Sequence, residues 1–563
     1  MNQDHLVAHY ERIADAPDAI PRLRRFILDL AVRGKLVPQD QADEPASELL
    51  KRIAAEKARL LKAGEIRNPK PIPPLLESPF PVPTNWRWSQ IAEIGILSPR
   101  NDAPDNMNAS FVPMPMIAAE YGVAIEHEMR PWSEIKKGYT HFAEGDVGLA
   151  KITPCFENGK STVFRNLTGG IGSGTTELHI VRPLCVDQDY ILIFFKSPHF
   201  IETGIPKMTG TAGQKRVPSE YFAHSPFPLP PLAEQHRIVA KVDELMALCD
   251  RLEAVRAERE AVRDRLAAAS LARLNAPDPD TFQDDARFAL ATLHALTTRP
   301  NQIKQLRQTI LNLAVRGKLV PQDPKDKAAR LPPLRQFAAA SEMDDEVFEQ
   351  SRDSIVLPNS WQIAPLAQLS EHIVDCPHTT PKWTDQGEIC IRTNQLRPRS
   401  LDLSEPRYVS REAYLERIER LEPRADDILY SREGGILGIA CRVPKGVRLC
   451  LGQRLMLIRA GTETSADFLE IVLNSPFITD IAKARTTGGA APRVNMSTVR
   501  AYPIPLPPLA EQRRIVAKVD ELMELCDRLE TSLAAAATTR RSLLDALLHE
   551  ALSPAPAELE AAE

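Results

Sequence analysis

The strongest hydrophobic pattern in the chain occurs twice. Residues 228–253 read PLPPLAEQHRIVAKVDELMALCDRLE, and residues 505–530 differ from them only at His236/Arg513 and Ala247/Glu524. In the first copy, apolar residues recur at alternating spacings of four and three: Ile238, Val242, Leu245, Cys249 and Leu252. This spacing predicts an amphipathic helix with a coiled-coil seam. The helix is expected over residues 232–274, after a pair of prolines that suits a helix start.

The second copy keeps the seam for longer. Its apolar positions are Ile515, Val519, Leu522, Cys526, Leu529, Leu533, Ala536, Leu543 and Leu547. We therefore expect a second long helix over residues 509–552.

Two further motifs also repeat. The segment AVRGKLVPQD occurs at residues 31–40 and 314–323, and the pattern Pro-x-x-Trp occurs at Pro83/Trp86 and Pro358/Trp361. These repeats divide the chain into two copies of one unit. Each AVRGKLVPQD segment ends a predicted helix at a glycine. The helix at 286–316 is expected to return antiparallel along the first arm, and the helix at 18–33 to pack with the C-terminal arm, so that the chain ends meet.

Between these helical parts lie two regions with a different hydrophobic pattern, residues 84–227 and 359–504. They contain short β-branched and aromatic runs with glycine turns, which predict mixed α/β domains. The fold class is therefore α+β, with two mixed α/β domains joined by two antiparallel long-helix spacers in a pseudo-twofold arrangement. The predicted organisation is an N-terminal helical segment 1–70 packed with the C-terminal helix, a proline-rich linker 71–83, the first domain 84–227, a central helical spacer 228–320, a linker 321–358, the second domain 359–504, a C-terminal helical spacer 505–553 and a disordered tail 554–563.

Polar residues of the repeated helix recur together with the apolar seam. A generic core helix constrains only its apolar positions, so the recurrence indicates that another protein contacts the polar side. The predicted partner-binding residues are Glu234, Gln235, Lys241, Asp243, Glu244, Glu511, Gln512, Lys518, Asp520 and Glu521.

Composition bounds the protein class. A length of 563 residues indicates two to four domains, and no apolar run approaches the roughly 18 residues of a membrane span. Eight scattered cysteines without a C-x-x-C pair indicate reduced thiols in a cytoplasmic protein. The group Cys376-Pro-His378 with Cys390 has the wrong spacing for a zinc site, so no metal is expected. The net charge of −5 does not by itself indicate a nucleic-acid binder, although acidic helices can mask local basic faces.

Catalytic motifs are missing from the sequence. The run Cys155–Ser161 resembles the end of a phosphate loop, but position 154 carries proline where that motif needs glycine. H-E-x-x-H, G-x-S-x-G and G-x-G-x-x-G do not occur. A duplicated scaffold that carries divergent domains favours recognition over catalysis, so the chain is not expected to be an enzyme. The alternative, a fused nuclease or DNA methyltransferase with its own active site, needs a cofactor loop or metal-binding carboxylates.

The paired repeats, together with GDVGLAKITPCFENGK at residues 145–160, resemble the specificity subunit of type I restriction-modification systems. The resemblance covers nearly the whole chain. It implies that each variable domain, a target recognition domain, reads one half of a bipartite, asymmetric double-stranded DNA site, while the repeated helices space the halves and dock two modification (methyltransferase) subunits. It also implies that S-adenosylmethionine, ATP and Mg2+ act on partner modification and restriction/motor subunits, with no cofactor on this chain. The second domain has LYSREGG at residues 429–435 in place of the AKITPCFENGK run, so the half-sites are expected to differ.

Candidate DNA-binding residues lie on glycine-punctuated loops and carry side chains that read base edges or hold phosphates. In the first domain they are Lys151, Lys160, Ser173, Thr175, Lys207, Gln214, Lys215 and Arg216. In the second domain they are Arg432, Gln453, Arg454, Arg485, Arg493 and Asn495. The alternative for each single residue is a solvated loop side chain without a binding role.

Overall fold

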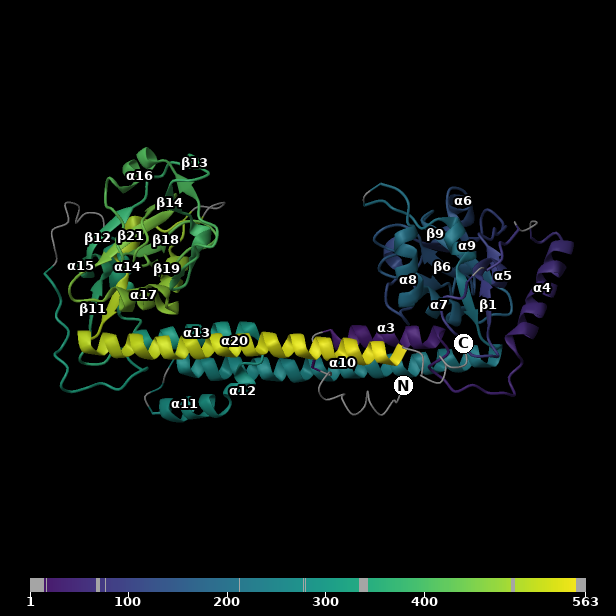
Figure 1. The fold of residues 1–563 in the computed structure, drawn as a ribbon, viewed down its shortest axis with the longest axis horizontal. Coiled ribbons are helices and arrows are strands. Elements are labelled where there is room, and N and C mark those ends of the chain that lie inside the picture. The colour runs from purple at the N-terminus through teal and green to yellow at the C-terminus, as the bar shows by residue number, and fades with distance from the viewer. Residues whose placement is uncertain are drawn as a thin grey trace. The chain divides into compact units, whose positions relative to one another are not determined.

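A computed structural model describes residues 15–16, 18–66, 71–75, 77–211, 213–276, 278, 280–333, 343–487 and 492–552. The predicted tail 554–563 lies outside these ranges. The chain divides into two compact units, Met1–Arg259 with Ala537–Glu563, and Glu260–Ala536. Each unit holds one mixed domain and a set of helices (Figure 1).

The two predicted long helices are present. They are α10 (Leu232–Asn275) and α20 (Leu509–Leu552), and each belongs to one unit at its start and to the other at its end. The first seam positions of both copies are fully buried: Ile238, Val242, Ile515 and Val519. The hydrophobic spacing therefore identified the buried face of both helices correctly.

In the first unit, the helix α3 (Ala19–Val32) packs against both long helices. Its Arg24 donates to Asp250 of α10 at 2.6 Å, while Gln39 further along the chain meets Glu234, so α3 runs antiparallel to the first part of α10. Asp18 pairs with Arg541 at 3.3 Å, and Ala16 and Ala19 form an apolar cluster with Leu544 and Leu547 of α20. The prediction that the two ends of the chain pack together is confirmed for these residues.

The second unit repeats this arrangement with α13 (Pro300–Val315). Arg307 of α13 donates to Asp527 at 2.7 Å and to Glu530 at 3.0 Å, the counterparts of the α3 contacts on α10. On its other side, Asn312 donates to the backbone carbonyl of Asn275 at 2.9 Å. Because α13 runs antiparallel to α20 and parallel to α10, the parts of α10 and α20 within this unit run antiparallel, as the sequence predicted.

The predicted single returning helix 286–316 is wrong. That segment forms α11 (Phe282–Ala291), the short α12 (Leu293–Leu296) and α13, which begins at Pro300. Proline lacks a backbone N–H and disfavours helical geometry in the residue before it, so a helix cannot run through Arg299 into Pro300 without distortion. The chain returns along α11 and α12, and α13 then runs in the same direction as α10.

The first mixed domain contains a two-stranded ribbon and two four-stranded sheets. The ribbon pairs β1 (Arg87–Gln90) with β10 (Pro226–Leu229). The first sheet has the order β2 (Gly95–Leu97), β9 (Leu178–Pro183), β6 (Val147–Ala150) and β7 (Ser161–Val163). The second has the order β4 (Glu128–Pro131), β3 (Asn108–Val112), β8 (Ile171–Gly174) and β5 (Thr140–Ala143).

The second mixed domain shares the ribbon and one four-stranded sheet with the first, despite its different sequence, and differs in its other sheets. A ribbon pairs β11 (Gln362–Pro365) with β22 (Pro503–Leu506). The sheet that matches the first sheet above has the order β12 (Ser370–Asp375), β21 (Leu455–Ala460), β18 (Ile428–Ser431) and β19 (Ala440–Arg442). A further sheet has the order β13 (Trp383–Thr384), β17 (Tyr408–Val409), β14 (Glu388–Ile391) and β20 (Leu449–Leu451). The segment 321–358, expected to be a linker, contains the helix α14 (Asp345–Arg352).

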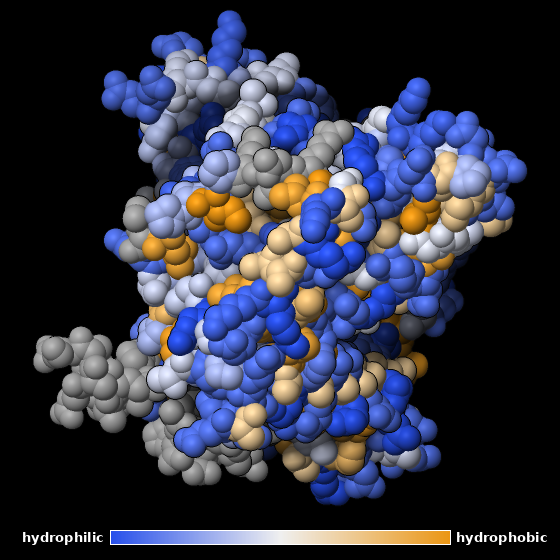
Figure 2. All heavy atoms as spheres, turned by 90° about the vertical axis from the view of Figure 1, so that its right-hand side faces the viewer, coloured by the Kyte–Doolittle hydropathy of each residue, from blue (hydrophilic) through white to orange (hydrophobic). Residues whose placement is uncertain are grey.

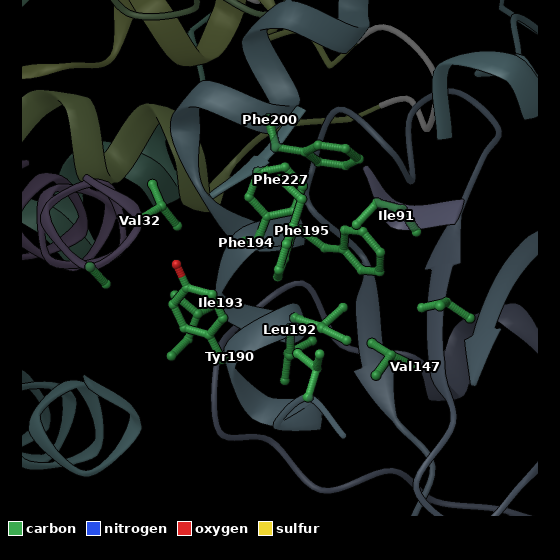
Figure 3. Close-up of a cluster of buried hydrophobic side chains, with 14 of the residues drawn as sticks. Val32, Ile91, Val147, Tyr190, Leu192, Ile193, Phe194, Phe195, Phe200 and Phe227 are labelled. Carbon is green, nitrogen blue, oxygen red and sulfur yellow. The ribbon is translucent and has the colours of Figure 1, made fainter. Parts of the chain in front are cut away.

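The main core of the first unit gathers around α7 (Gln188–Lys196), whose side chains are buried between the sheet and α3. Figure 3 shows Phe194 and Phe195 of α7 with Val147 of β6 on one side and Val32 of α3 on the other. Asp187 caps this helix by accepting from the backbone N–H groups of residues 189 and 190. Each fully buried phenylalanine contributes roughly 1.5–3 kcal/mol, so α7 anchors the first mixed domain on the helices. In the second unit, α17 (Ala466–Asn474) takes the same place against α13.

Among the described residues, no helix has the length and apolar character needed to cross a membrane. The face of the chain in Figure 2 is mostly hydrophilic, with apolar side chains scattered among charged ones.

Candidate nucleic-acid interface

The repeated motifs converge on one buried carboxylate in the first unit. Glu234 of α10 is 0% exposed, and it accepts from the indole Nε1 of Trp86 at 3.0 Å and from Gln39 Nε2 at 2.6 Å. Trp86 belongs to the Pro-x-x-Trp repeat and Gln39 to the AVRGKLVPQD repeat. Gly34 of the same repeat has φ +69°, and a Cβ there would lie 2.5 Å from Pro83. We call these contacts the glutamate cluster.

The second unit contains a matching glutamate cluster. Glu511 accepts from Gln322 Nε2 at 2.5 Å, and Trp361 lies beside it. Burial raises the pKa of both Glu234 and Glu511, while the neighbouring indoles and amides oppose the rise. Alongside, Arg237 pairs with Asp43 and Arg514 with Asp326, both at 2.6 Å. The repeated sequences therefore surround a buried glutamate with the same residue types in both units, although the indole Nε1 of Trp361 makes no hydrogen bond where that of Trp86 does.

This network corrects the predicted partner surface. Gln235 accepts from the backbone of Asp187 at 2.9 Å, and Gln512 accepts from the backbone of Ser465 at 2.8 Å. Both glutamines are 0% exposed. The prediction that a partner contacts Glu234, Gln235, Glu511 and Gln512 is wrong, because all four are buried and bonded inside the chain. Their recurrence is explained by the joint between each long helix and its own recognition domain.

The other predicted partner-binding residues remain at the surface. Lys241 pairs with Glu244, and Lys518 with Glu521, at 2.9 Å within each helix. Asp243 accepts from the Tyr121 hydroxyl at 2.8 Å, and its counterpart Asp520 accepts from Arg399 at 2.6 Å. These two aspartates thus tie each helix to its own recognition domain through side chains that differ between the copies. The role of all six residues toward a partner stays a prediction.

In the second domain, several loops meet at one end of the sheet that contains β12, β21 and β18. Register pairs Asp375 with Met456 and Ser431 with Leu455, so the ends of β12 and β18 lie beside the start of β21. The segments 376–380, 432–435 and 452–454 follow from these positions. We call this surface the second recognition edge.

Four of the predicted DNA-binding residues lie at or beside this edge and are accessible to solvent. Arg493 forms isolated β-bridges with Glu433 and Thr487, and the backbone of Gly434 donates to Pro492 at 2.8 Å. A Cβ at Gly434 would lie 3.5 Å from Arg454, which has φ +70°. The four residues that share this surface are Gln453, Arg454, Arg493 and Asn495.

Two predicted residues of the second domain lie differently. Arg432 is 6% exposed; it donates to Asp375 at 2.5 Å and to the carbonyl of Val494 at 3.2 Å. The prediction that Arg432 contacts DNA is therefore wrong, because its guanidinium group is buried and forms its hydrogen bonds inside the domain. Arg485 donates to Gln350 of α14 at 2.6 Å, and its DNA role stays a prediction.

The first domain has an equivalent edge. Register pairs Ala150 with Leu178, and the backbone of Lys151 donates to Glu177 at 3.0 Å. The backbone of Thr153 donates to Lys215 at 2.9 Å, which brings the 209–217 segment onto the same end of the sheet. This first recognition edge unites most of the predicted residues: Lys151, Lys160, Thr175, Gln214, Lys215 and Arg216.

The charges at the first recognition edge are only partly paired. Arg216 forms a two-pronged pair with Glu177 at 2.8–3.2 Å, and this contact lowers the Glu177 pKa. Lys207, Gln214 and Lys215 are exposed. Ser173 is an exception, since it is 0% exposed in β8 and donates to the carbonyl of Ile135 at 2.8 Å. The prediction that Ser173 contacts DNA is wrong for this reason.

The sequence analysis missed the segment 376–380 at the second recognition edge. Its residues were considered only as a zinc site, and among the described residues no group of three or more His, Cys, Asp or Glu side chains could hold a metal ion. The available signal was a Pro-His-Thr-Thr run directly after a strand, because polar side chains at strand ends commonly line binding surfaces.

Comparisons with known proteins point to one family. Residues 399–538 match the family model for the type I restriction modification DNA specificity domain. The chain is 37% identical over 558 residues to the Escherichia coli type I restriction enzyme EcoEI specificity subunit, covering 95% of this chain and 94% of the relative. The EcoAI specificity subunit gives the same identity and coverage. The crystal structure of the HsdS subunit from Thermoanaerobacter tengcongensis is 20% identical, covering 85% of this chain and 99% of that chain, with a TM-score of 0.44.

The fold and its two recognition edges define a recognition protein, in which a duplicated helical frame carries two domains that share a central sheet and differ in their surfaces. The relatives identify the family. The chain belongs to the family of type I restriction enzyme specificity subunits.

Proposed function

We propose that each recognition edge reads one half of a bipartite, asymmetric site in double-stranded DNA. The observation that carries this proposal is the pair of edges itself. Each lies at the corresponding end of the matching four-stranded sheet in its own domain, yet the first presents Lys151, Gln214 and Lys215 and the second Gln453, Arg454 and Arg493. Arginine, lysine and glutamine are the side chains best suited to base edges and phosphates. Different side chains on matching sheets give different half-sites.

The repeated helices supply the proposed docking sites for two modification subunits. When the buried residues are set aside, the recurring residues leave one exposed or partly exposed face on each helix, which we call the docking face. In the first copy it consists of Lys241, Glu244, Leu248 and Arg251, and in the second of Lys518, Glu521, Leu525 and Arg528. Their spacings of three and four place them on one side of a helix. Leu248 is 42% exposed and offers an apolar contact among the charges.

In this proposal, the partner subunits carry out the chemistry of modification and cleavage. Modification subunits would use S-adenosylmethionine on adenine, restriction/motor subunits would use ATP and Mg2+, and the complex would act in the cytoplasm. This chain would recognise the DNA sequence at which the complex acts. The reading is supported by membership of the specificity-subunit family.

The test uses the chain assembled with its modification subunits. The complex should select an interrupted, asymmetric site from a random DNA pool and methylate it with S-adenosylmethionine. The chain alone should transfer no methyl groups. Sustained turnover by the purified chain would instead favour a fused methyltransferase.

A further inference from the structure

The segment Cys376–Thr380, which leaves β12 at the second recognition edge, is fixed by polar contacts at three points. Asp375 Oδ2 lies 3.0 Å from Nε2 of His378. Arg417 donates to the carbonyl of Thr379 at 2.7 Å, and Gln453 Nε2 donates to the carbonyl of His378 at 3.0 Å. The backbone of this segment is therefore held in one arrangement before any ligand arrives.

Two of the groups that hold the segment are buried arginines. Arg417 is 8% exposed and also donates to the carbonyl of Leu451 at 2.9 Å. Arg432 is buried as well and donates to the Asp375 carboxylate. Buried charges are costly, and apolar side chains of similar size often stabilise a fold as well or better. Stability alone does not account for two buried guanidinium groups beneath an exposed segment. Preorganisation of that segment does, because ordering its backbone is then no longer a cost of binding.

The side chains that this segment presents are polar and accessible. The His378 side chain is 60% exposed, and Thr379 and Thr380 are exposed beside it. Gln453, which supports the segment, lies next to the exposed Arg454 at the start of β21. The imidazole thus stands among the residues that form the second recognition edge.

The contacts of His378 determine which ring nitrogen remains available. The Asp375 carboxylate can only accept, so the 3.0 Å contact places the proton of the neutral ring on Nε2. The Arg432 guanidinium also approaches Nε2, at 3.5 Å, but the same nitrogen of Arg432 already donates to Asp375 at 2.5 Å. The shorter contact decides the tautomer. In the neutral ring, Nδ1 of His378 is then the unprotonated nitrogen and can accept a hydrogen bond.

We propose that His378 is a specificity-determining residue, whose Nδ1 accepts a hydrogen bond from the exocyclic amino group of one cytosine or adenine in the half-site of the second domain. Those amino groups are the donors that bases present in the major groove. The inference rests on the proposed function and deepens it, since it assigns one base contact to one side chain.

The experiment compares DNA selection by three complexes, each containing the full chain and its modification subunits: the parent, His378→Ala and His372→Ala. His372 is a matched control, because it is an exposed histidine in β12, the strand that leads into the segment. His378→Ala should lower the preference at one cytosine- or adenine-containing position of the second half-site by on the order of tenfold, the value of one hydrogen bond. The other positions and the whole first half-site should be unchanged, and His372→Ala should select as the parent does.

The retained first half-site shows that the His378→Ala complex is folded and assembled. An unchanged preference at every position of the second half-site would overturn the inference. So would an equal loss of preference in both half-sites, since a base-reading residue acts on one. A parent complex that selects no bipartite site would instead refute the proposed function, and this outcome is distinct from the other two.

Discussion

The glutamate cluster of the first unit makes a quantitative prediction. Replacing Trp86 by phenylalanine removes the indole N–H that donates to the Glu234 carboxylate at 3.0 Å. Trp86 is 1% exposed and Glu234 is 0% exposed, so water cannot replace the lost donor without opening the joint. A hydrogen bond to a charged group contributes about 1.5–3 kcal/mol. The smaller ring adds a cavity cost of roughly 1 kcal/mol, so unfolding should become easier by about 2–4 kcal/mol.

The assay is chemical unfolding followed by circular dichroism, because removing a tryptophan alters fluorescence directly. Trp88→Phe is the matched control, since Trp88 lies two residues further along β1, is only half-buried and packs edge-on against Phe80. Trp88→Phe should cost clearly less than Trp86→Phe. If both variants unfold within about 0.5 kcal/mol of each other, the buried glutamate does not depend on its indole donor, and the explanation for the repeated Pro-x-x-Trp motif is wrong.

The remaining predictions concern charge, the seam and the docking faces. Burial raises the Glu234 pKa in the folded chain, so the parent should gain stability relative to Glu234→Gln as pH falls through that raised pKa toward the ordinary value of 4.5; if the parent gains no stability relative to the variant between pH 7 and pH 4.5 in paired unfolding curves, this prediction is wrong. Val519→Asp should destabilise the second unit by several kcal/mol in thermal unfolding, more than Leu522→Asp does, because Val519 is fully buried and Leu522 only partly; a Val519→Asp variant that unfolds like the parent would contradict the seam. Glu244→Arg should reduce the modification subunits bound per chain from two to one in native mass spectrometry, whereas Glu258→Arg outside the repeat should leave two; retention of both subunits by the first variant would refute the docking face.

The helical frame was predictable because its signals are local. Alternating spacings of three and four identify a buried helix face wherever it lies, and they gave both α10 and α20 nearly to the residue. The glycine Gly34 likewise predicted where α3 ends. The break at Pro300 was also local and could have been read from the proline, but the amphipathic pattern on either side of it suggested one continuous helix.

The burial of Glu234 could not be predicted in this way. A glutamate on the polar side of an amphipathic helix normally faces water, and the partners that bury it, Gln39 and Trp86, lie 195 and 148 residues away in sequence. The recurrence of all three motifs was the one available signal, and it was assigned to an external partner. Identical polar residues in two copies are explained equally well by an internal joint that must form twice.

The sequence predicted which loops form the recognition edges better than it predicted which of their residues are exposed. The glycine-punctuated segments around Lys151 and Gln453 do meet at sheet ends, but residue type alone could not separate an exposed reader from a buried support such as Arg432 or Ser173. The sheet that the two domains share was not visible either, because their strands are mostly two to six residues long and carry different sequences. Strand order depends on contacts between distant segments, which a single sequence does not reveal.

The central claim is that the two domains read the two half-sites independently. The most direct measurement exchanges residues 84–227 for the recognition domain of another specificity subunit, assembles both the parent and the exchanged chain with modification subunits, and selects their targets from a random DNA pool. The account predicts that one half of the selected site changes while the sequence of the other half stays the same. A new sequence in both halves, or an unchanged site, would contradict it.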